Sequence, residues 1–267
     1  MSDATIKVFD DEDEVTIDAA TPQPEEPAKK AVKSDKILDA IMDRIAPAGI
    51  NTPTLKVLIY GDAGTGKTTL ASTAPAPLFI DVERGSRALL NTDSHADVLE
   101  FRSIEQVEAA VQYMKNGRPE FDKYETIVLD SITEMQARLM DQQLRQLGAT
   151  SGAITYKAGW DEYNINAQRL RMLISSFRDI EKNLICTAHA KQEKDETTGL
   201  TITKPLLPPA LSKTVIGVFD IVAYLRINTK GERVLRVHPS KTILAKSRLG
   251  LPDEIVTPTW KLLDIQQ

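Results

Sequence analysis

GDAGTGKT, residues 61–68, directly follows the apolar stretch LKVLIY (55–60) and directly precedes a segment that can form a helix, Lys67 to about Thr73. The eight residues match the pattern G-x-x-x-x-G-K-[ST] of phosphate-binding loops. In such a loop the backbone N–H groups and the start of the helix surround phosphate oxygens. The order of strand, glycine-rich loop and helix therefore predicts an α/β core that binds a nucleotide.

The loop residues have distinct predicted roles toward ATP and Mg²⁺. Lys67 is expected to reach the β and γ phosphates, and the Thr68 hydroxyl is expected to bind the metal ion. Contacts to the nucleotide are predicted for Gly61, Asp62, Ala63, Gly64, Thr65, Gly66, Lys67, Thr68 and Thr69.

Apolar strands alternate with helices along the rest of the chain. Further strands are predicted at 78–81, 98–101, 126–130 and 183–188, and helices at 104–114, 132–147 and 160–181. The segments 218–228, 233–238 and 242–246 are expected to add antiparallel strands, with a turn at 228–231. This pattern predicts a mostly parallel sheet with helices on both faces and antiparallel C-terminal strands.

Charge divides the chain into parts. Residues 1–36 hold ten acidic residues and five lysines, which accounts for the whole net charge of -5. We expect 1–34 to be an acidic disordered tail, 35–54 a helix and linker, and 55–267 the catalytic domain. Residues 191–248 hold eleven basic and five acidic residues, a composition that favours a polyanionic partner.

Several classes of protein are disfavoured. There is no apolar run of about 18 residues and no N-terminal signal segment, so we expect no membrane association and a cytoplasmic location. The single Cys186 can form no internal disulfide, and the three histidines lack the spacing of zinc ligands.

Carboxylates at predicted strand ends are the candidate catalytic groups. Asp130 ends TIVLD, where it can hold Mg²⁺ or, alternatively, cap the next helix. Many P-loop ATPases have a glutamate at the next position, but here it is Ser131, so Glu83 in FIDVERG is the predicted base. Asp81 and Glu134 remain alternative bases, and Glu83 could instead be a solvated turn residue.

GDAGTGKT, FIDVE, IVLDS and a strand ending in TAH resemble, in motif and order, the RecA-like recombination ATPases. The resemblance covers about 55–251 and is strongest to small phage-encoded members associated with single-strand annealing. It implies that Glu83 activates water and that His189 senses the γ-phosphate, where RecA usually has glutamine. It also implies that Lys246 and Arg248 enter a neighbour's nucleotide site in a ring or filament. A phage-encoded member would act in the cytoplasm of the bacterial host.

The same resemblance implies that 148–159 and 190–212 are mobile loops that contact single-stranded DNA. The predicted DNA-binding residues are Tyr156, Lys157, Lys191, Lys194, Lys204 and Lys213. Trp160 could stack on bases as Tyr156 could, or it could anchor a helix. The acidic tail is a candidate contact for the basic segment, for a single-strand-binding protein or for another replication partner.

Two other functions share these motifs. An assembly ATPase or loader in DNA replication would carry the same interface lysine and arginine. A small-molecule phosphotransferase would share the phosphate loop, but it normally needs an arginine-rich lid, and no such segment is visible in the sequence.

Overall fold

The computed structural model describes residues 39, 42, 54–92, 94–147, 159–214 and 216–264. The chain divides into two units, Met1–Asn51 and Thr52–Gln267. In the first unit the predicted acidic tail lies outside the described residues. Asp39 and Met42 are helical and exposed, and the rest of the predicted helix lies outside the described residues.

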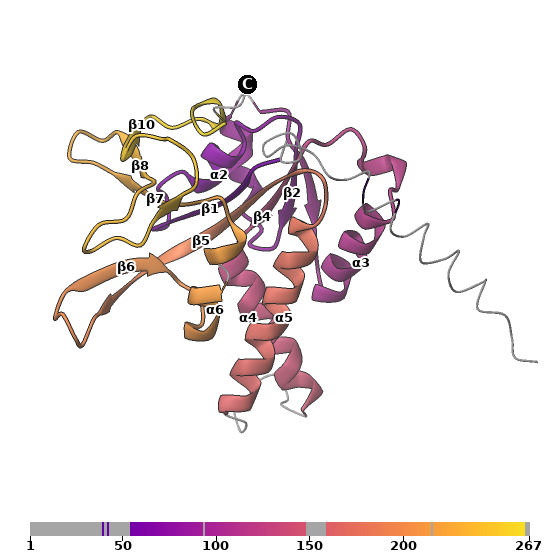
Figure 1. Cartoon of the computed structure of the whole chain (residues 1–267). Coiled ribbons are helices and arrows are strands. Elements are labelled where there is room, and N and C mark those ends of the chain that lie inside the picture. Colours follow the sequence, from indigo (N-terminus) through magenta and orange to yellow (C-terminus); the bar gives the residue numbers. More distant parts are fainter. Residues whose placement is uncertain are drawn as a thin grey trace, which may run out of the picture. The chain divides into compact units, whose positions relative to one another are not determined.

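A ten-stranded sheet is the centre of the second unit (Figure 1). Its main path runs in the order β10-β8-β7-β1-β5-β4-β2-β3. The strands are β1 (Lys56–Gly61), β2 (Pro77–Asp81), β3 (Asp97–Glu100), β4 (Thr126–Asp130), β5 (Asn183–Lys194), β6 (Thr201–Pro205), β7 (Ile221–Ile227), β8 (Arg233–Arg236), β9 (Lys246–Ser247) and β10 (Glu254–Val256). Strands β7, β1, β5, β4, β2 and β3 are mutually parallel, whereas β6, β8, β9 and β10 pair antiparallel. The predicted fold class is therefore confirmed.

Helices connect the parallel strands, since a crossover between parallel strands must span the sheet. The α-helices are α2 (Lys67–Ala71), α3 (Ile104–Lys115), α4 (Ile132–Gln146), α5 (Trp160–Arg178) and α6 (Pro209–Thr214). Short 3₁₀ helices are η1 (Ser86–Asn91), η2 (Pro119–Phe121), η3 (Ile216–Val218) and η4 (Trp260–Leu262). No helix among the described residues is long and apolar enough to cross a membrane.

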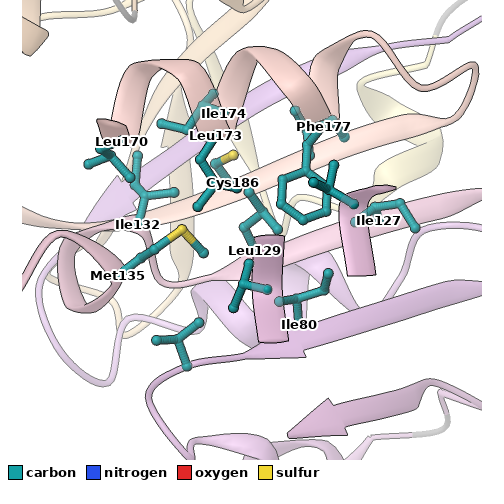
Figure 2. Close-up of a cluster of buried hydrophobic side chains, with 14 of the residues drawn as sticks. Ile80, Ile127, Leu129, Ile132, Met135, Leu170, Leu173, Ile174, Phe177 and Cys186 are labelled. Atoms are coloured by element: carbon teal, nitrogen blue, oxygen red, sulfur yellow. The ribbon is translucent and has the colours of Figure 1, made fainter. Parts of the chain in front are cut away.

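Both faces of the sheet are buried, which explains why the strands read as continuous apolar runs. In β1, Leu58 and Tyr60 belong to the core beneath α3, α4 and α5, whereas Val57 and Ile59 belong to the core that includes α2 and η4. Figure 2 shows the first core, where Phe177 and Ile174 of α5 lie over strand residues such as Leu129.

Two predicted boundaries are wrong because tertiary pairing overrides local pattern. Strand β5 does not end at Ala188 but continues to Lys194, because residues 190–194 pair with β6. The segment 242–246 contributes only Lys246 to β9, and the chain before it bonds instead to β6, with Thr203 donating to the Thr242 carbonyl. The Tyr60 hydroxyl donates to the Thr203 carbonyl and so ties β6 to the parallel sheet.

Lys56 provides a test of the buried amino edge of β1. Its Nζ donates to the carbonyls of Ile180 and Lys182, and burial lowers its pKa to about 8. Because the unfolded chain binds this proton up to a higher pH, folding stability should rise as the pH rises from about 8 toward 10. Urea unfolding of the wild type and Lys56→Met across this range measures the effect. A stability difference between the two proteins that does not change with pH would contradict the prediction.

Candidate active site

The loop between β1 and α2 has the backbone that phosphate binding requires. Gly64 and Gly66 have φ angles of 80° and 95°, in the left-handed region that glycine adopts without strain. Gly61 lies so close to the Leu225 carbonyl of β7 that a side chain there would overlap it. The glycines of GDAGTGKT are therefore needed for conformation at two positions and for close strand packing at the third.

Lys67 closes this loop. Its Nζ donates to the carbonyls of Gly61 at 3.1 Å and Asp62 at 2.9 Å. Burial lowers the pKa of Lys67, and the nearby carboxylates of Glu83, Asp130 and Asp62 oppose that effect. The ammonium group thus lies within the loop on weak carbonyl partners, which phosphate oxygens can replace as stronger, charged acceptors.

Asp130 lies next to Thr68, as the predicted metal site requires. The Thr68 hydroxyl donates to Asp130 Oδ2 at 2.7 Å, and the Thr187 hydroxyl donates to Oδ1. Asp130 is 3% exposed, and burial raises its pKa although both hydroxyl bonds oppose the change. A hydroxyl and a carboxylate side by side are hard oxygen ligands that fit Mg²⁺ bound together with phosphate and water.

The alternative role of Asp130 as a helix cap is wrong. Ser131 is the N-cap of α4, and its hydroxyl accepts the Glu134 N–H. The peptide bond between Asp130 and Ser131 is cis.

Glu83 lies at the same edge of the sheet. Its Oε1 accepts the Ser131 hydroxyl at 2.7 Å and lies 2.9 Å from His189 Nε2. Its side chain is 30% exposed, so the carboxylate is held by hydrogen bonds yet open to solvent. Glu83 is therefore not the freely solvated turn residue of the alternative interpretation.

The two alternative bases, Asp81 and Glu134, form other interactions. Asp81 accepts the backbone N–H groups of Gly85 and Ser86 and so fixes the turn after β2. Glu134 pairs with Arg138 one helical turn later on α4. Of the three candidate carboxylates, Glu83 is the one that contacts His189 and the N-cap of α4.

His189 connects this edge to the following hairpin. It lies opposite Gly61 in the β1–β5 register, and its backbone N–H donates to the Thr133 hydroxyl at 3.0 Å. Thr133 in turn donates to the Leu206 carbonyl, and the Leu206 N–H donates to the His189 carbonyl at 2.7 Å. These bonds join the predicted sensor to the residue directly after β6.

The predicted DNA-binding residues are only partly brought together. The segment 190–212 is not a loop: it forms the end of β5, the antiparallel strand β6 and the start of α6. Lys191 and Lys204 face each other in register, and both pair with Glu193, at 2.9 and 2.7 Å. Lys194 is exposed at the end of β5.

The other predicted contacts are separate from this hairpin. Tyr156 and Lys157 lie outside the described residues, as do the side-chain surroundings of Lys213 in α6. Trp160 begins α5 and is 80% exposed, so it does not anchor that helix in the core.

Lys246 and Arg248 lie at the opposite, amino edge of the sheet. Lys246 pairs with Val222 near the start of β7, and its Nζ donates to the carbonyls of Ile216 and Phe219. Arg248 pairs with Asp220 at 2.9 Å. The phosphate loop lies at the carboxyl edge, so this basic pair is remote from the nucleotide site of its own chain.

Thr187 and Thr133 were missed by sequence reasoning. Thr187 lies in the apolar strand NLICTA, two residues before His189. The pairing of β5 with β4 brings its hydroxyl to Asp130. A polar residue within an otherwise buried strand was the available signal, because buried hydroxyls need partners.

A comparison with family models found one match. A model described as an AAA domain matches residues 54–249. None of the curated proteins compared with the chain matches it.

Replacement of Asp130 should separate stability from function. Because burial raises the folded-state pKa, the folded protein retains this proton to a higher pH than the unfolded chain, and its stability falls as pH rises through that interval. Asp130→Asn should therefore unfold at a higher urea concentration than the wild type at pH 7, while its binding of magnesium-ATP weakens. The stability gain should shrink on acidification, and urea unfolding at several pH values combined with calorimetric titration measures both effects. A less stable variant at pH 7 would contradict the prediction.

Replacement of Glu83 should affect the chemical step. Glu83→Gln should lower kcat for ATP hydrolysis by roughly 10²- to 10⁴-fold, the usual contribution of a general base, with little change in ATP affinity. Glu134→Gln is the matched control, since it removes the neighbouring carboxylate at the start of α4. Equal kcat values for the two variants would show that Glu83 is not the base.

Proposed function

Because the chain belongs to the AAA domain family, we propose that this P-loop ATPase couples ATP hydrolysis to single-stranded DNA in recombination or annealing. The observation that carries the coupling is the hydrogen-bonded connection from Glu83 through His189 to the base of the β5–β6 hairpin.

In the proposed ATPase cycle, the nucleotide is held by the phosphate loop and Lys67, and Thr68 and Asp130 hold Mg²⁺. The metal ion, when bound, compensates the charge of the phosphate oxygens. Glu83 accepts a proton from the attacking water, and its bonds to Ser131 and His189 orient the carboxylate for this role.

The proposed coupling uses the hydrogen bond between the Glu83 carboxylate and His189. A γ-phosphate accepts hydrogen bonds and therefore competes with the Glu83 carboxylate for His189, whereas an attacking water donates and competes with His189 for that carboxylate. Any displacement of His189 acts on Leu206 through two contacts, the direct backbone bond and the Thr133 hydroxyl. The hairpin is thereby biased by the state of the nucleotide.

The β5–β6 hairpin supplies the proposed DNA contacts through Lys191, Lys194 and Lys204. Glu193 pairs with two of these lysines, but ion pairs of an exposed carboxylate are screened by solvent and contribute little, so DNA phosphates can replace it. The segment 242–244 lies beside Thr203 of β6, and Lys241 directly precedes it in the chain.

Self-association is part of the proposal. Lys246 and Arg248 lie at the amino edge of the sheet, remote from the phosphate loop of the same chain. A ring or filament in which the amino edge of one subunit faces the carboxyl edge of the next would bring this pair to a nucleotide.

A loader or assembly ATPase is the second candidate. Residues 191–205 contain three lysines and three acidic residues, so the hairpin has no net charge. A neutral hairpin with paired charges also suits a protein partner.

The DNA contact is tested with the double variant Lys191→Ala/Lys204→Ala. Its affinity for single-stranded DNA in the presence of a non-hydrolysable ATP analogue should fall, and the slope of log affinity against log salt should decrease by about one for each lysine. Fluorescence anisotropy with a labelled oligonucleotide measures both quantities. Lys115→Ala, an exposed lysine at the end of α3, is the control.

Stimulation of ATP hydrolysis by single-stranded DNA completes this test. We expect the wild type to be stimulated and the double variant to require more DNA for the same effect. A wild type that hydrolyses ATP but shows neither stimulation nor ATP-dependent DNA binding would favour the loader.

A further inference from the structure

A pocket of about 360 Å³ lies beside the phosphate loop. Thr69 of α2 and Thr73, just after this helix, form one wall, Arg233 at the start of β8 forms the second, and Thr257 and Pro258 after β10 form the third. The volume falls within the roughly 300–1,000 Å³ of small-molecule sites. Arg233, Thr257 and Pro258 lie outside the sequence motif GDAGTGKT that identifies the phosphate loop.

Arg233 lies directly on the phosphate loop of its own chain. A side chain built on Gly66 would overlap the Arg233 Nε and approach its Cδ to 3.0 Å. The Arg233 side chain is exposed, and within the described part of the chain it has no hydrogen-bond or ion-pair partner. The other arginines of the C-terminal strands differ, since Arg226 and Arg236 both pair with Glu254.

The backbone of Arg233 is held in place. Its carbonyl accepts the N–H of Thr257 at 2.8 Å, which joins two walls of the pocket. The wall of Thr69 and Thr73 is joined to the segment after β10, because the Thr73 hydroxyl accepts the backbone N–H of Trp260 at 2.8 Å. The pocket is therefore built by hydrogen bonds between segments far apart in the sequence.

We propose that this pocket takes the base and ribose of the bound nucleotide and that the Arg233 guanidinium binds its phosphate chain. The inference rests on the proposed ATPase function and extends the site from the phosphate loop to β8 and the segment after β10. It also gives the nucleotide a cation from its own subunit, in addition to Lys67 and to the pair proposed to come from a neighbour.

The location of the pocket fits a nucleoside attached to loop-bound phosphates. Thr69 directly follows Thr68, so one wall of the pocket begins beside the predicted metal ligand. A second pocket near α2 also includes Thr69, but it extends to Ala76 and Pro77, and His95 is the one basic residue among the described residues that line it. The Arg233 guanidinium, which lies beside the loop and has no partner among the described residues, instead matches the negative charge of phosphate.

The test compares magnesium-ATP with magnesium tripolyphosphate, which has phosphates but no nucleoside. Wild-type protein should bind ATP more tightly than tripolyphosphate. Thr257→Trp, which fills the pocket, should weaken ATP binding to about the level of tripolyphosphate and leave tripolyphosphate affinity unchanged. Unchanged tripolyphosphate affinity also shows that the variant is folded with an intact phosphate loop.

Arg233→Gln should have the opposite pattern. It should weaken ATP and tripolyphosphate alike, by roughly ten- to hundredfold, the effect of losing one charge-assisted hydrogen bond. Arg233→Lys, which keeps the charge, should restore part of the affinity for both, and Arg226→Gln is the matched control on the neighbouring strand.

The outcomes are separable. Equal wild-type affinities for ATP and tripolyphosphate, or wild-type ATP binding by Thr257→Trp, would overturn the nucleoside pocket. Loss of ATP binding alone in Arg233→Gln would overturn the phosphate role of Arg233. A wild type that binds neither compound would instead overturn the proposed ATPase function.

Discussion

The register of the parallel strands is the constraint on which the site depends. Gly61 lies opposite His189 in the β1–β5 pair, and Asp81 lies opposite Asp130 in the β2–β4 pair. The carboxyl ends of four adjacent strands thus meet at one edge, where side chains leave the two packed layers. A slip of one residue would turn the side chains of a strand to the other face and carry Asp130 away from Thr68.

The same edge holds buried ionisable groups that cost folding free energy when no ligand is bound. Burial raises the pKa of Asp130 and lowers that of Lys67, so for both groups the surroundings disfavour the ionised form. The Thr68 and Thr187 hydroxyls and the loop carbonyls offset only part of this cost. A triphosphate with its metal ion provides charges of both signs at these positions. Binding of such a ligand would therefore stabilise the folded protein and offset the free-energy cost of burying these groups.

Continuity of β5 links the chemistry to the surface that we propose it controls. The strand passes through the core at Cys186, reaches the edge at His189 and leaves the parallel sheet as one arm of the β5–β6 hairpin. This segment is a paired strand continuous with the parallel sheet, in place of the mobile loop expected from the resemblance. The hairpin has equal numbers of basic and acidic residues, so its net charge does not favour nucleic acid over a protein partner.

Local sequence was sufficient for the phosphate loop, the fold class and the carboxylates at strand ends. The glycines of GDAGTGKT and the apolar runs that end at Gly61 and Asp130 encode conformation and burial within a few residues of each other, so short-range pattern predicts them. Two of the wrong predictions, the end of β5 and the strand at 242–246, concern segments with backbone partners in other strands. Thr187 beside Asp130, Arg233 on Gly66 and the pocket between α2 and β10 likewise became visible only in three dimensions. Their positions follow from strand order and long-range hydrogen bonds, because contacts of this kind join residues that no local periodicity relates.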